Sequence, residues 1–202
     1  MESLYKTNDN SEVCSAVTLA DTEALIRLFE QVAAEEGWSA GGQLRAFLQN
    51  AVYFSLYVGG TLAGGLQLVR PSTSGKLPGH AVWPELPDPD PQSAHIVILA
   101  LKREYRGCPE RFWLLCAEMW RYCFRQRITH LYLEVTPATL KVYRRLGWPL
   151  EVIGEPRVHW GEDCVPARFD LCAAAGEVVR RAESSPLYRR IAAQLFRASG
   201  QG

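Results

Sequence analysis

The chain has 202 residues, and 48% of them are hydrophobic, which suits one α/β domain with a sizeable core and leaves little room for a second. Its 22 lysines and arginines balance 22 aspartates and glutamates, so the net charge does not support binding of nucleic acid or of an acidic membrane. No apolar run approaches the roughly 20 residues of a membrane span, and residues 1–9 hold no apolar signal segment. We expect a soluble, cytoplasmic protein.

The six cysteines form no CxxC pair and no Cys/His cluster at the spacing of a zinc site. We therefore expect reduced, mostly buried thiols and no metal ion. The six are Cys14, Cys108, Cys116, Cys123, Cys164 and Cys172.

The first half of the chain predicts a helix and then an antiparallel hairpin. Thr18 and Asp21 offer an N-cap for a helix with apolar residues at helical spacing, which Gly37 ends. Gly59-Gly60 is a turn signal between two apolar segments. The expected elements are a flexible tail at 1–12, then a single domain over 13–198 that begins with a strand at 13–17, a helix at 18–37, a short helix at 42–49 and strands at 52–58 and 62–69.

The second half predicts alternating strands and helices behind a long connection. Residues 70–92 hold six prolines and are expected to be an irregular loop, of a kind that is often functional. The remaining expected elements are strands at 95–101, 131–135, 151–156 and 167–171 and helices at 109–127, 138–146 and 177–198, the last broken near 184–186. This order predicts an α+β fold of three layers, a mixed twisted sheet with helices on both faces.

Two segments carry candidate chemistry. In the first, a buried strand runs into a basic turn that contains Arg103, Arg106 and Gly107. Backbone N–H groups at a helix N-terminus, beside guanidinium groups, favour phosphate oxygens, although simple solvation explains Arg103 equally well. In the second, Tyr143 lies near the end of a helix that Gly147 stops, a place where a tyrosine is often only part of the core.

In this order and spacing the segments resemble the GNAT superfamily of N-acyltransferases. Tyr105-Arg106-Gly107 before an apolar helix is similar to its pantetheine- and pyrophosphate-binding motif, and Tyr143 with Gly147-Trp148 is similar to its tyrosine helix. The resemblance implies splayed central strands and an acyl-CoA or an acyl-[acyl carrier protein] as donor. The implied donor contacts are Leu99, Ala100, Leu101, Arg103, Arg106, Gly107 and Cys108.

The mechanism that this resemblance implies is direct attack of an amine on the thioester. A backbone N–H of residues 99–101 would stabilise the oxyanion, and Tyr143 would give a proton to the leaving thiolate. Two residues remain candidates for the general base. His95 has a suitable intrinsic pKa, although a strand-end histidine without a catalytic role is the more common case, and Glu134 is more simply explained as the buried partner of an arginine.

Three stretches resemble a narrower group, the acyl-homoserine-lactone (autoinducer) synthases and the long-chain N-acyl amino acid synthases. They are residues 62–87, 95–107 and 144–171. The group implies an amino acid-like acceptor. Its Glu-x-Ser-Arg pattern is replaced by His95-Ile-Val-Ile98, so we expect a product other than acyl-homoserine lactone. Pro109 and Arg111 stand where acetyl-CoA enzymes carry glycines, which favours a carrier protein as the donor.

Several further assignments stay open. Trp38, Trp83 and Phe47 line an acyl or acceptor pocket in one interpretation and belong to the core in the other. A group of basic residues suits either an acidic carrier protein or a solvated helix face; it comprises Arg121, Arg125, Arg127, Lys141, Arg144 and Arg145. The alternative functions are an acetyl-CoA-dependent acetyltransferase and a non-catalytic GNAT-like domain that binds an acyl ligand.

Overall fold

Nine strands form one mixed sheet in the computed structural model of the protein, which describes residues 3–6, 10–15, 18–39, 42–72 and 75–196. Their order is β1-β2-β3-β4-β5-β6-β9-β7, with β8 paired to β9. Among the described strands, only β5 and β6 pair in parallel. The strands are β1 (Ser3–Lys6), β2 (Ser11–Ser15), β3 (Ala51–Val58), β4 (Thr61–Val69), β5 (Ser93–Leu101), β6 (His130–Val135), β7 (Leu150–Val152), β8 (Arg157–His159) and β9 (Glu162–Asp170).

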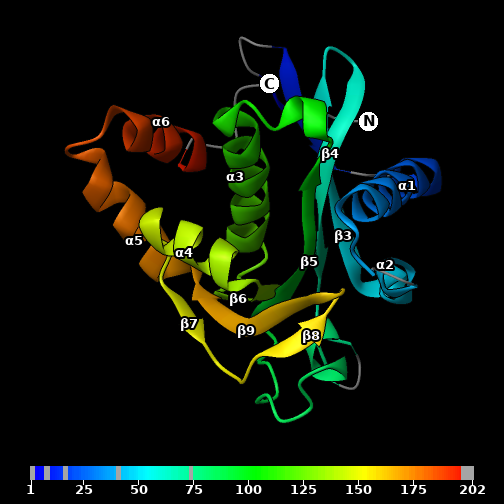
Figure 1. The fold of residues 1–202 in the computed structure, drawn as a ribbon. Helices are drawn as coiled ribbons and strands as arrows, with labels where there is room; N and C mark the ends of the chain where they lie inside the picture. The colour runs from blue at the N-terminus through cyan, green and yellow to red at the C-terminus, as the bar shows by residue number, and fades with distance from the viewer. Residues whose placement is uncertain (1–2, 7–9, 16–17, 40–41, 73–74, 197–202) are drawn as a thin grey trace.

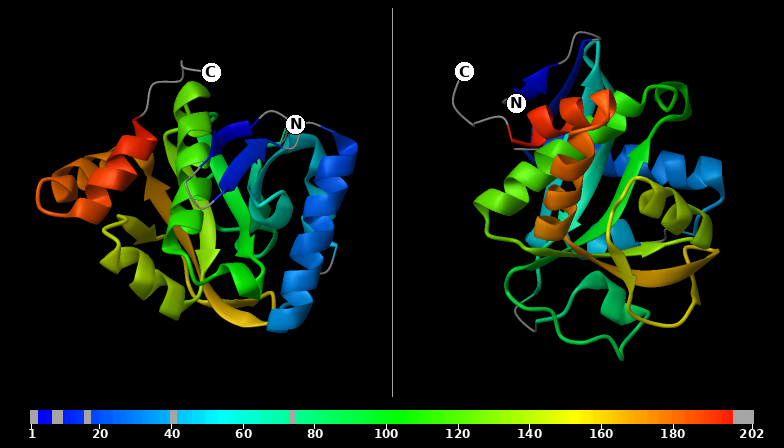
Figure 2. Two further views of the ribbon diagram at one scale, coloured as in Figure 1. Left: turned by 90° about the horizontal axis from the view of Figure 1, so that it is seen from above. Right: turned by 90° about the vertical axis from the view of Figure 1, so that its left-hand side faces the viewer.

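Helices cover both faces of the sheet, as expected (Figures 1 and 2). α1 and α2 share one hydrophobic cluster with the sheet, whereas α3 to α6 share the cluster on the opposite face. The helices are α1 (Leu19–Glu36), α2 (Gln43–Ala46), α3 (Pro109–Arg125), α4 (Pro137–Arg145), α5 (Leu171–Ala182) and α6 (Pro186–Leu195), and the short 3-10 turns are η1 (Leu48–Asn50), η2 (Pro78–Ala81) and η3 (Arg103–Tyr105). Within the described residues, no helix has the length and apolar character needed to cross a membrane.

Both ends of α1 are explained by capping interactions. The Thr18 hydroxyl accepts a hydrogen bond from the Asp21 N–H at 3.1 Å, and the Asp21 carboxylate accepts one from the Thr18 N–H at 3.3 Å. This reciprocal cap satisfies N–H groups that a helix leaves unpaired at its start. Gly37 ends the helix in the left-handed region, at φ 75°. The expected helix at 18–37 is confirmed.

The two central strands separate in the middle of the sheet. The parallel pairing of β5 with β6 stops at Ile96 and Leu133, although β5 continues to Leu101. On its other edge β5 carries an extra residue, Val97, which the register with β4 skips. Such a bulge bends a strand, and it occurs where β5 leaves β6. The expected splayed strands are confirmed.

Both ends of the chain differ from the sequence prediction. The expected tail at 1–12 contains β1, which pairs with β2 at the sheet edge. Edge pairing uses backbone groups, so it needs no apolar pattern. The expected strand at 151–156 is shorter, and β8 and the first half of β9 were not predicted. α5 begins at Leu171 instead of 177, since Asp170 caps it by accepting a hydrogen bond from the Ala173 N–H at 2.9 Å. Residues 16–17 and 197–198 lie outside the described residues.

Gly65 in β4 is required by close packing, and its replacement tests the sheet. A Cβ atom there would lie 2.6 Å from Leu25 Cδ1 and closer still to the Phe54 carbonyl oxygen. We expect Gly65→Ala to lower the free energy of unfolding by about 1–3 kcal/mol, because the paired backbone cannot move aside. Chemical denaturation measures this. Gly176→Ala in α5, with nothing within 4 Å of the new atom, is the control; equal stability of the two variants would refute the packing argument.

Candidate active site

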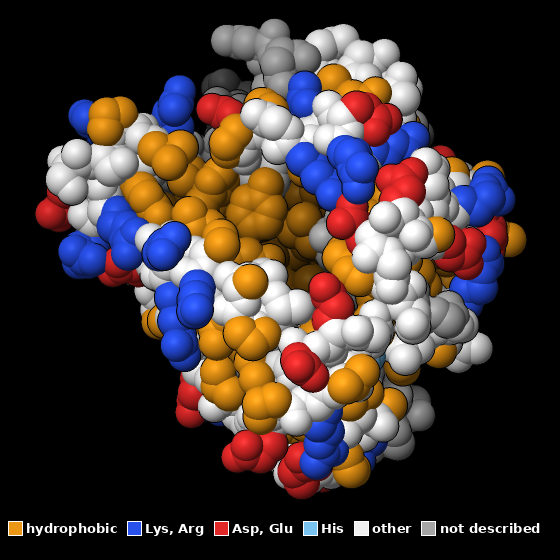
Figure 3. Space-filling model, viewed as in Figure 1, with side chains coloured by type: hydrophobic (Ala, Val, Ile, Leu, Met, Phe, Trp, Pro, Cys, Tyr) orange, Lys and Arg blue, Asp and Glu red, His pale blue; other side chains and the backbone are white. Residues whose placement is uncertain are grey.

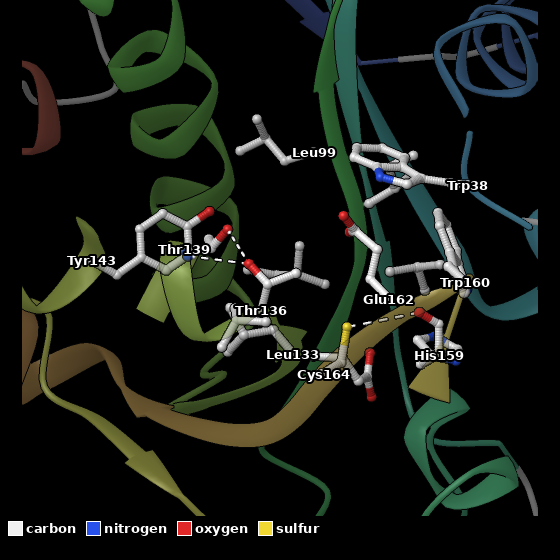
Figure 4. Close-up of a pocket in the computed structure, with 15 residues that line it drawn as sticks. Trp38, Leu99, Leu133, Thr136, Thr139, Tyr143, His159, Trp160, Glu162 and Cys164 are labelled. Carbon is white, nitrogen blue, oxygen red and sulfur yellow. Dashed lines mark hydrogen bonds between the residues drawn. The ribbon is translucent and has the colours of Figure 1, made fainter. Parts of the chain in front are cut away.

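A cavity of about 280 Å³ lies where β5 and β6 separate. Figure 3 shows its mouth as a hollow lined by hydrophobic side chains, and Figure 4 shows the side chains around it. The two central strands, the start of α4, Trp38 and the β8–β9 hairpin all contribute. The lining residues are Trp38, Ile96, Val97, Ile98, Leu99, Leu133, Glu134, Val135, Thr136, Thr139, Tyr143, His159, Trp160, Glu162 and Cys164.

Tyr143 enters the cavity from α4, with its hydroxyl directed toward β5 (Figure 4). The helix is fixed at its start because the Thr136 hydroxyl accepts a hydrogen bond from the Thr139 N–H at 3.2 Å. The Tyr143 ring packs against Trp148, at 4.6 Å between ring centroids. Burial raises the pKa of Tyr143 above its ordinary value of 10. The phenol therefore stays protonated at neutral pH, as a proton donor must.

Glu134 and His95 form a buried pair across the two central strands. His95 Nε2 lies 2.8 Å from Glu134 Oε2, and the two side chains are 2% and 8% exposed. An ionised carboxylate only accepts hydrogen bonds, so Nε2 carries the hydrogen when Glu134 is charged. Glu134 lines the cavity, whereas His95 lies behind it in a small neighbouring cavity beneath η2. The two candidate bases are thus hydrogen-bonded to each other, and the partner of Glu134 is His95 instead of an arginine.

The proline-rich loop holds this pair in place through Gly79 of η2. A Cβ atom on Gly79 would lie 2.6 Å from Glu134 Oε1 and 3.1 Å from His95 Cε1. The loop expected at 70–92 therefore reaches the site, where its short helical turn η2 covers the Glu134–His95 pair.

Gly79→Ala is expected to lower the turnover number kcat by about 10- to 100-fold, because the added methyl displaces the Glu134 carboxylate from its position. Steady-state acyl transfer measures the loss, and circular dichroism checks that the fold persists. Gly176→Ala should retain full activity. Wild-type kcat in Gly79→Ala would show that the position of the carboxylate is unimportant.

The sequence analysis did not predict the β8–β9 hairpin, which lines one side of the cavity. Its two-residue turn, Trp160-Gly161, has positive φ at both positions, 56° and 86°. This conformation is unfavourable for tryptophan, and contacts with the α1–α2 region hold it. The Trp160 indole donates a hydrogen bond to Gln43 Oε1 at 2.7 Å, and the Ser39 N–H donates to the Trp160 carbonyl at 2.9 Å. The hairpin brings His159 and Glu162 to the cavity; the Trp-Gly dipeptide was the one available turn signal.

The basic turn after β5 lies beyond the cavity. Arg106 donates from Nη1 to Glu36 Oε1 at 2.7 Å and from Nε to the Leu101 carbonyl at 2.8 Å. Arg103 Nη2 lies 3.7 Å from the same Glu36 oxygen. Hydrogen bonding to Arg106 is the main cause that holds the pKa of Glu36 below its usual value. Both candidate phosphate ligands therefore already have a carboxylate partner, at the C-terminal end of α1.

The other residues expected to contact the donor follow one another along β5, the turn after it and the start of α3. Only Leu99 lines the cavity, and Ala100 and Leu101 continue along β5. Gly107 follows η3, and Cys108 is the N-cap of α3, where its side chain makes no capping hydrogen bond. The structure thus brings Tyr143, Glu134 and Leu99 together and leaves the basic turn at the far end of β5.

The three aromatic candidates for the pocket lie in different surroundings. Trp38 lines the cavity, whereas Trp83 is fully buried beside Leu86 and Cys164, and Phe47 lies half-buried between α2 and η1. All six cysteines are free thiols. Burial raises the pKa of Cys164 to about 11, which makes this cavity residue a poor nucleophile. Among the described residues, no three side chains are grouped as a metal site would require.

Neither protein-family models nor curated proteins match the sequence. The fold, however, matches solved structures. FeeM, an N-acyl amino acid synthase from uncultured soil microbes, superposes with a TM-score of 0.70 at 15% identity over 89% of this chain and 97% of that one. BjaI, a CoA-dependent acyl-homoserine lactone synthase solved with SAM and isopentyl-CoA, gives a TM-score of 0.62 at 17% identity over 86% and 89%.

A Desulfovibrio desulfuricans protein described as a GNAT-family acetyltransferase gives a TM-score of 0.53 at 13% identity over 80% and 99% of the chains. The chain has the GNAT fold. At these identities the likeness is one of fold. In the GNAT fold of this chain, the separated strands, Tyr143 and Glu134 meet at one cavity, and His95 binds Glu134 from behind it.

Proposed function

We propose that the protein is an N-acyltransferase that moves an acyl group from a pantetheine thioester to an amine. One observation carries the proposal. The cavity between the separated strands has a protonated phenol, Tyr143, in its α4 wall and a carboxylate, Glu134, on β6, backed by His95. A proton donor and a proton acceptor that share one cavity suit a reaction that removes a proton from a nucleophile and returns one to a leaving group.

The proposed reaction is a direct attack of the amine on the thioester. The amine nitrogen attacks the thioester carbon, and a C–N bond forms as the carbonyl oxygen becomes an oxyanion. Glu134 accepts the proton that the nitrogen loses, with the carboxylate held by the Nε2–H of His95. The C–S bond then breaks, and Tyr143 gives its proton to the thiolate. The carbonyl re-forms as the C–S bond breaks, an amide and a free thiol leave, and solvent takes the proton from Glu134 and returns one to the phenolate.

The backbone of β5 is the proposed oxyanion site. Beyond Ile96 the strand has no partner on the β6 side in the described chain, and alternate N–H groups of a strand point to each edge. Residues 99–101 therefore include N–H groups that face the gap between the strands. A thioester carbonyl lying along this edge would receive a hydrogen bond as negative charge develops on its oxygen.

Two features support a carrier protein as the donor. Arg106, the best candidate for a nucleotide phosphate, is already paired with Glu36, and Pro109 has no N–H to offer at the start of α3. On α4, Lys141, Arg144 and Arg145 are exposed and make no ion pair within the described chain. Lysines and arginines gather on the α4–α5 rim of the hollow in Figure 3. A CoA donor remains the second candidate, because BjaI, of the same fold, is CoA-dependent.

The test is a transfer assay with one long acyl chain presented on acyl carrier protein or on CoA, and with acetyl-CoA as a third donor. A panel of amines serves as acceptor, and mass spectrometry detects the product. An N-acyl product formed faster from the carrier protein supports the whole proposal. Product formed mainly from acetyl-CoA would favour the acetyltransferase alternative. Binding of either donor without any product would overturn catalysis and leave a ligand-binding domain.

A further inference from the structure

The described cavity lining carries acidic side chains without basic ones to balance them. Among the described residues, the cavity lining includes two carboxylates, Glu134 and Glu162, and no lysine or arginine. His159 is the only histidine of the described lining, and burial lowers the pKa of its imidazole, which favours the neutral form. An amino acid acceptor would bring a carboxylate into this cavity without a positive partner.

Glu162 differs from Glu134 in having no partner of its own. Within the described residues its carboxylate makes no hydrogen bond or ion pair, whereas Glu134 is bound to His95. In Figure 4 the Glu162 side chain points into the cavity from the start of β9. A carboxylate in this position attracts cations and repels anions.

Two indole rings line the same cavity as the Glu162 carboxylate. Trp38 and Trp160 both line the cavity, with ring centroids 6.3 Å apart and planes inclined by 57°. Trp160 keeps an unfavourable backbone conformation and is fixed by its hydrogen bond to Gln43. Tryptophan faces attract cations, so a carboxylate and two indoles form a recognition site for a positively charged group.

We propose that the acceptor is a cationic amine without a carboxylate, bound with a positively charged nitrogen between Glu162 and the indoles of Trp38 and Trp160. The inference rests on the proposed acyl transfer and replaces the amino acid-like acceptor that the sequence resemblance implied. The nitrogen that is acylated first loses one proton to solvent, which gives the neutral amine, and then loses a second proton to Glu134 as the C–N bond forms. In a diamine, the second ammonium remains charged at Glu162; in a monoamine, Glu162 binds the ammonium before its first proton is lost.

The experiment compares ligands that differ only in the carboxylate. Binding of cadaverine and lysine, and of phenethylamine and phenylalanine, is measured by isothermal titration calorimetry, and each compound is also tried as acceptor in the transfer assay. We expect each amine to bind about tenfold or more tightly than its amino acid, because like charges in a cavity oppose binding. Equal or tighter binding of the amino acids, or no binding of either amine, overturns the inference.

Variants separate the role of Glu162 from a general effect of charge. Glu162→Gln should weaken binding of both amines about tenfold, and Glu162→Lys should reverse the preference toward lysine and phenylalanine. Glu151→Gln, an exposed carboxylate on β7 that pairs with Arg168, is the control and should change neither. Unchanged selectivity in Glu162→Lys contradicts the proposal. If the amines bind selectively but no acylated product forms, the proposed acyl transfer is contradicted, whereas the inference that the cavity binds cationic amines is supported.

Discussion

Glu134→Gln is expected to lower kcat about a hundredfold to ten-thousandfold, the usual contribution of a general base. Glutamine has the same shape and can still accept a hydrogen bond from His95 Nε2, but its amide cannot take a proton from the attacking nitrogen. Steady-state and single-turnover acyl transfer measure the loss, with the Michaelis constant for the amine expected to change little.

Two comparisons make the result specific to Glu134. His95→Asn removes the imidazole that holds the carboxylate and leaves Glu134 in place, so its loss should be smaller and its pH–rate profile shifted. Glu151→Gln, outside the cavity, should behave like wild type. A Glu134→Gln enzyme with near-normal single-turnover rates would show that another group accepts the proton.

Tyr143→Phe is expected to lower kcat about a hundredfold with a natural thioester, because the leaving thiolate then receives no proton from the enzyme. The loss should depend on the leaving group. A 4-nitrothiophenyl ester releases a much weaker base, so its turnover should be nearly equal in the variant and the wild type. Tyr57→Phe on β3, outside the cavity, serves as the control.

The pH dependence of the wild type gives a second check on Tyr143. Burial raises the pKa of its phenol, so the protonated, donating form persists to higher pH than for a free tyrosine. The rate should therefore show no alkaline loss from this group below about pH 10. An equal loss in Tyr143→Phe for both thioesters would mean that the hydroxyl does not act by protonating the leaving thiolate, and no loss for either thioester would mean that only the ring is needed.

Local chemistry explains what the sequence predicted well. The Thr18–Asp21 cap, the Gly37 stop and the Gly59-Gly60 turn involve neighbours in the chain, so short-range patterns determine them. The apolar run 96–101 of β5 is also predictable, because Ile98 and Ala100 pack on the α1 side while Leu101 packs on the α3 side. The expectation of parted strands came from the resemblance of motifs, and the register of β5 with β6 confirms it.

What the sequence could not predict depends on contacts between distant residues. The Glu134–His95 pair joins residues 39 positions apart, and it exists only because the parallel register sets β5 beside β6 as it does. The Arg106–Glu36 pair spans 70 positions and changes the interpretation of the basic turn. A strand register and a helix-to-loop contact are tertiary results, which no local pattern in one sequence encodes.

A crystal structure with a non-hydrolysable acyl-pantetheine analogue would show whether the donor binds where β5 and β6 separate. We expect the pantetheine arm to lie between β5 and β6, with its sulfur about 3 Å from the Tyr143 hydroxyl and its carbonyl oxygen against the β5 backbone at residues 99–101. An analogue bound elsewhere on the molecule, or inside the cavity with its sulfur turned away from Tyr143, would contradict acyl transfer at this site.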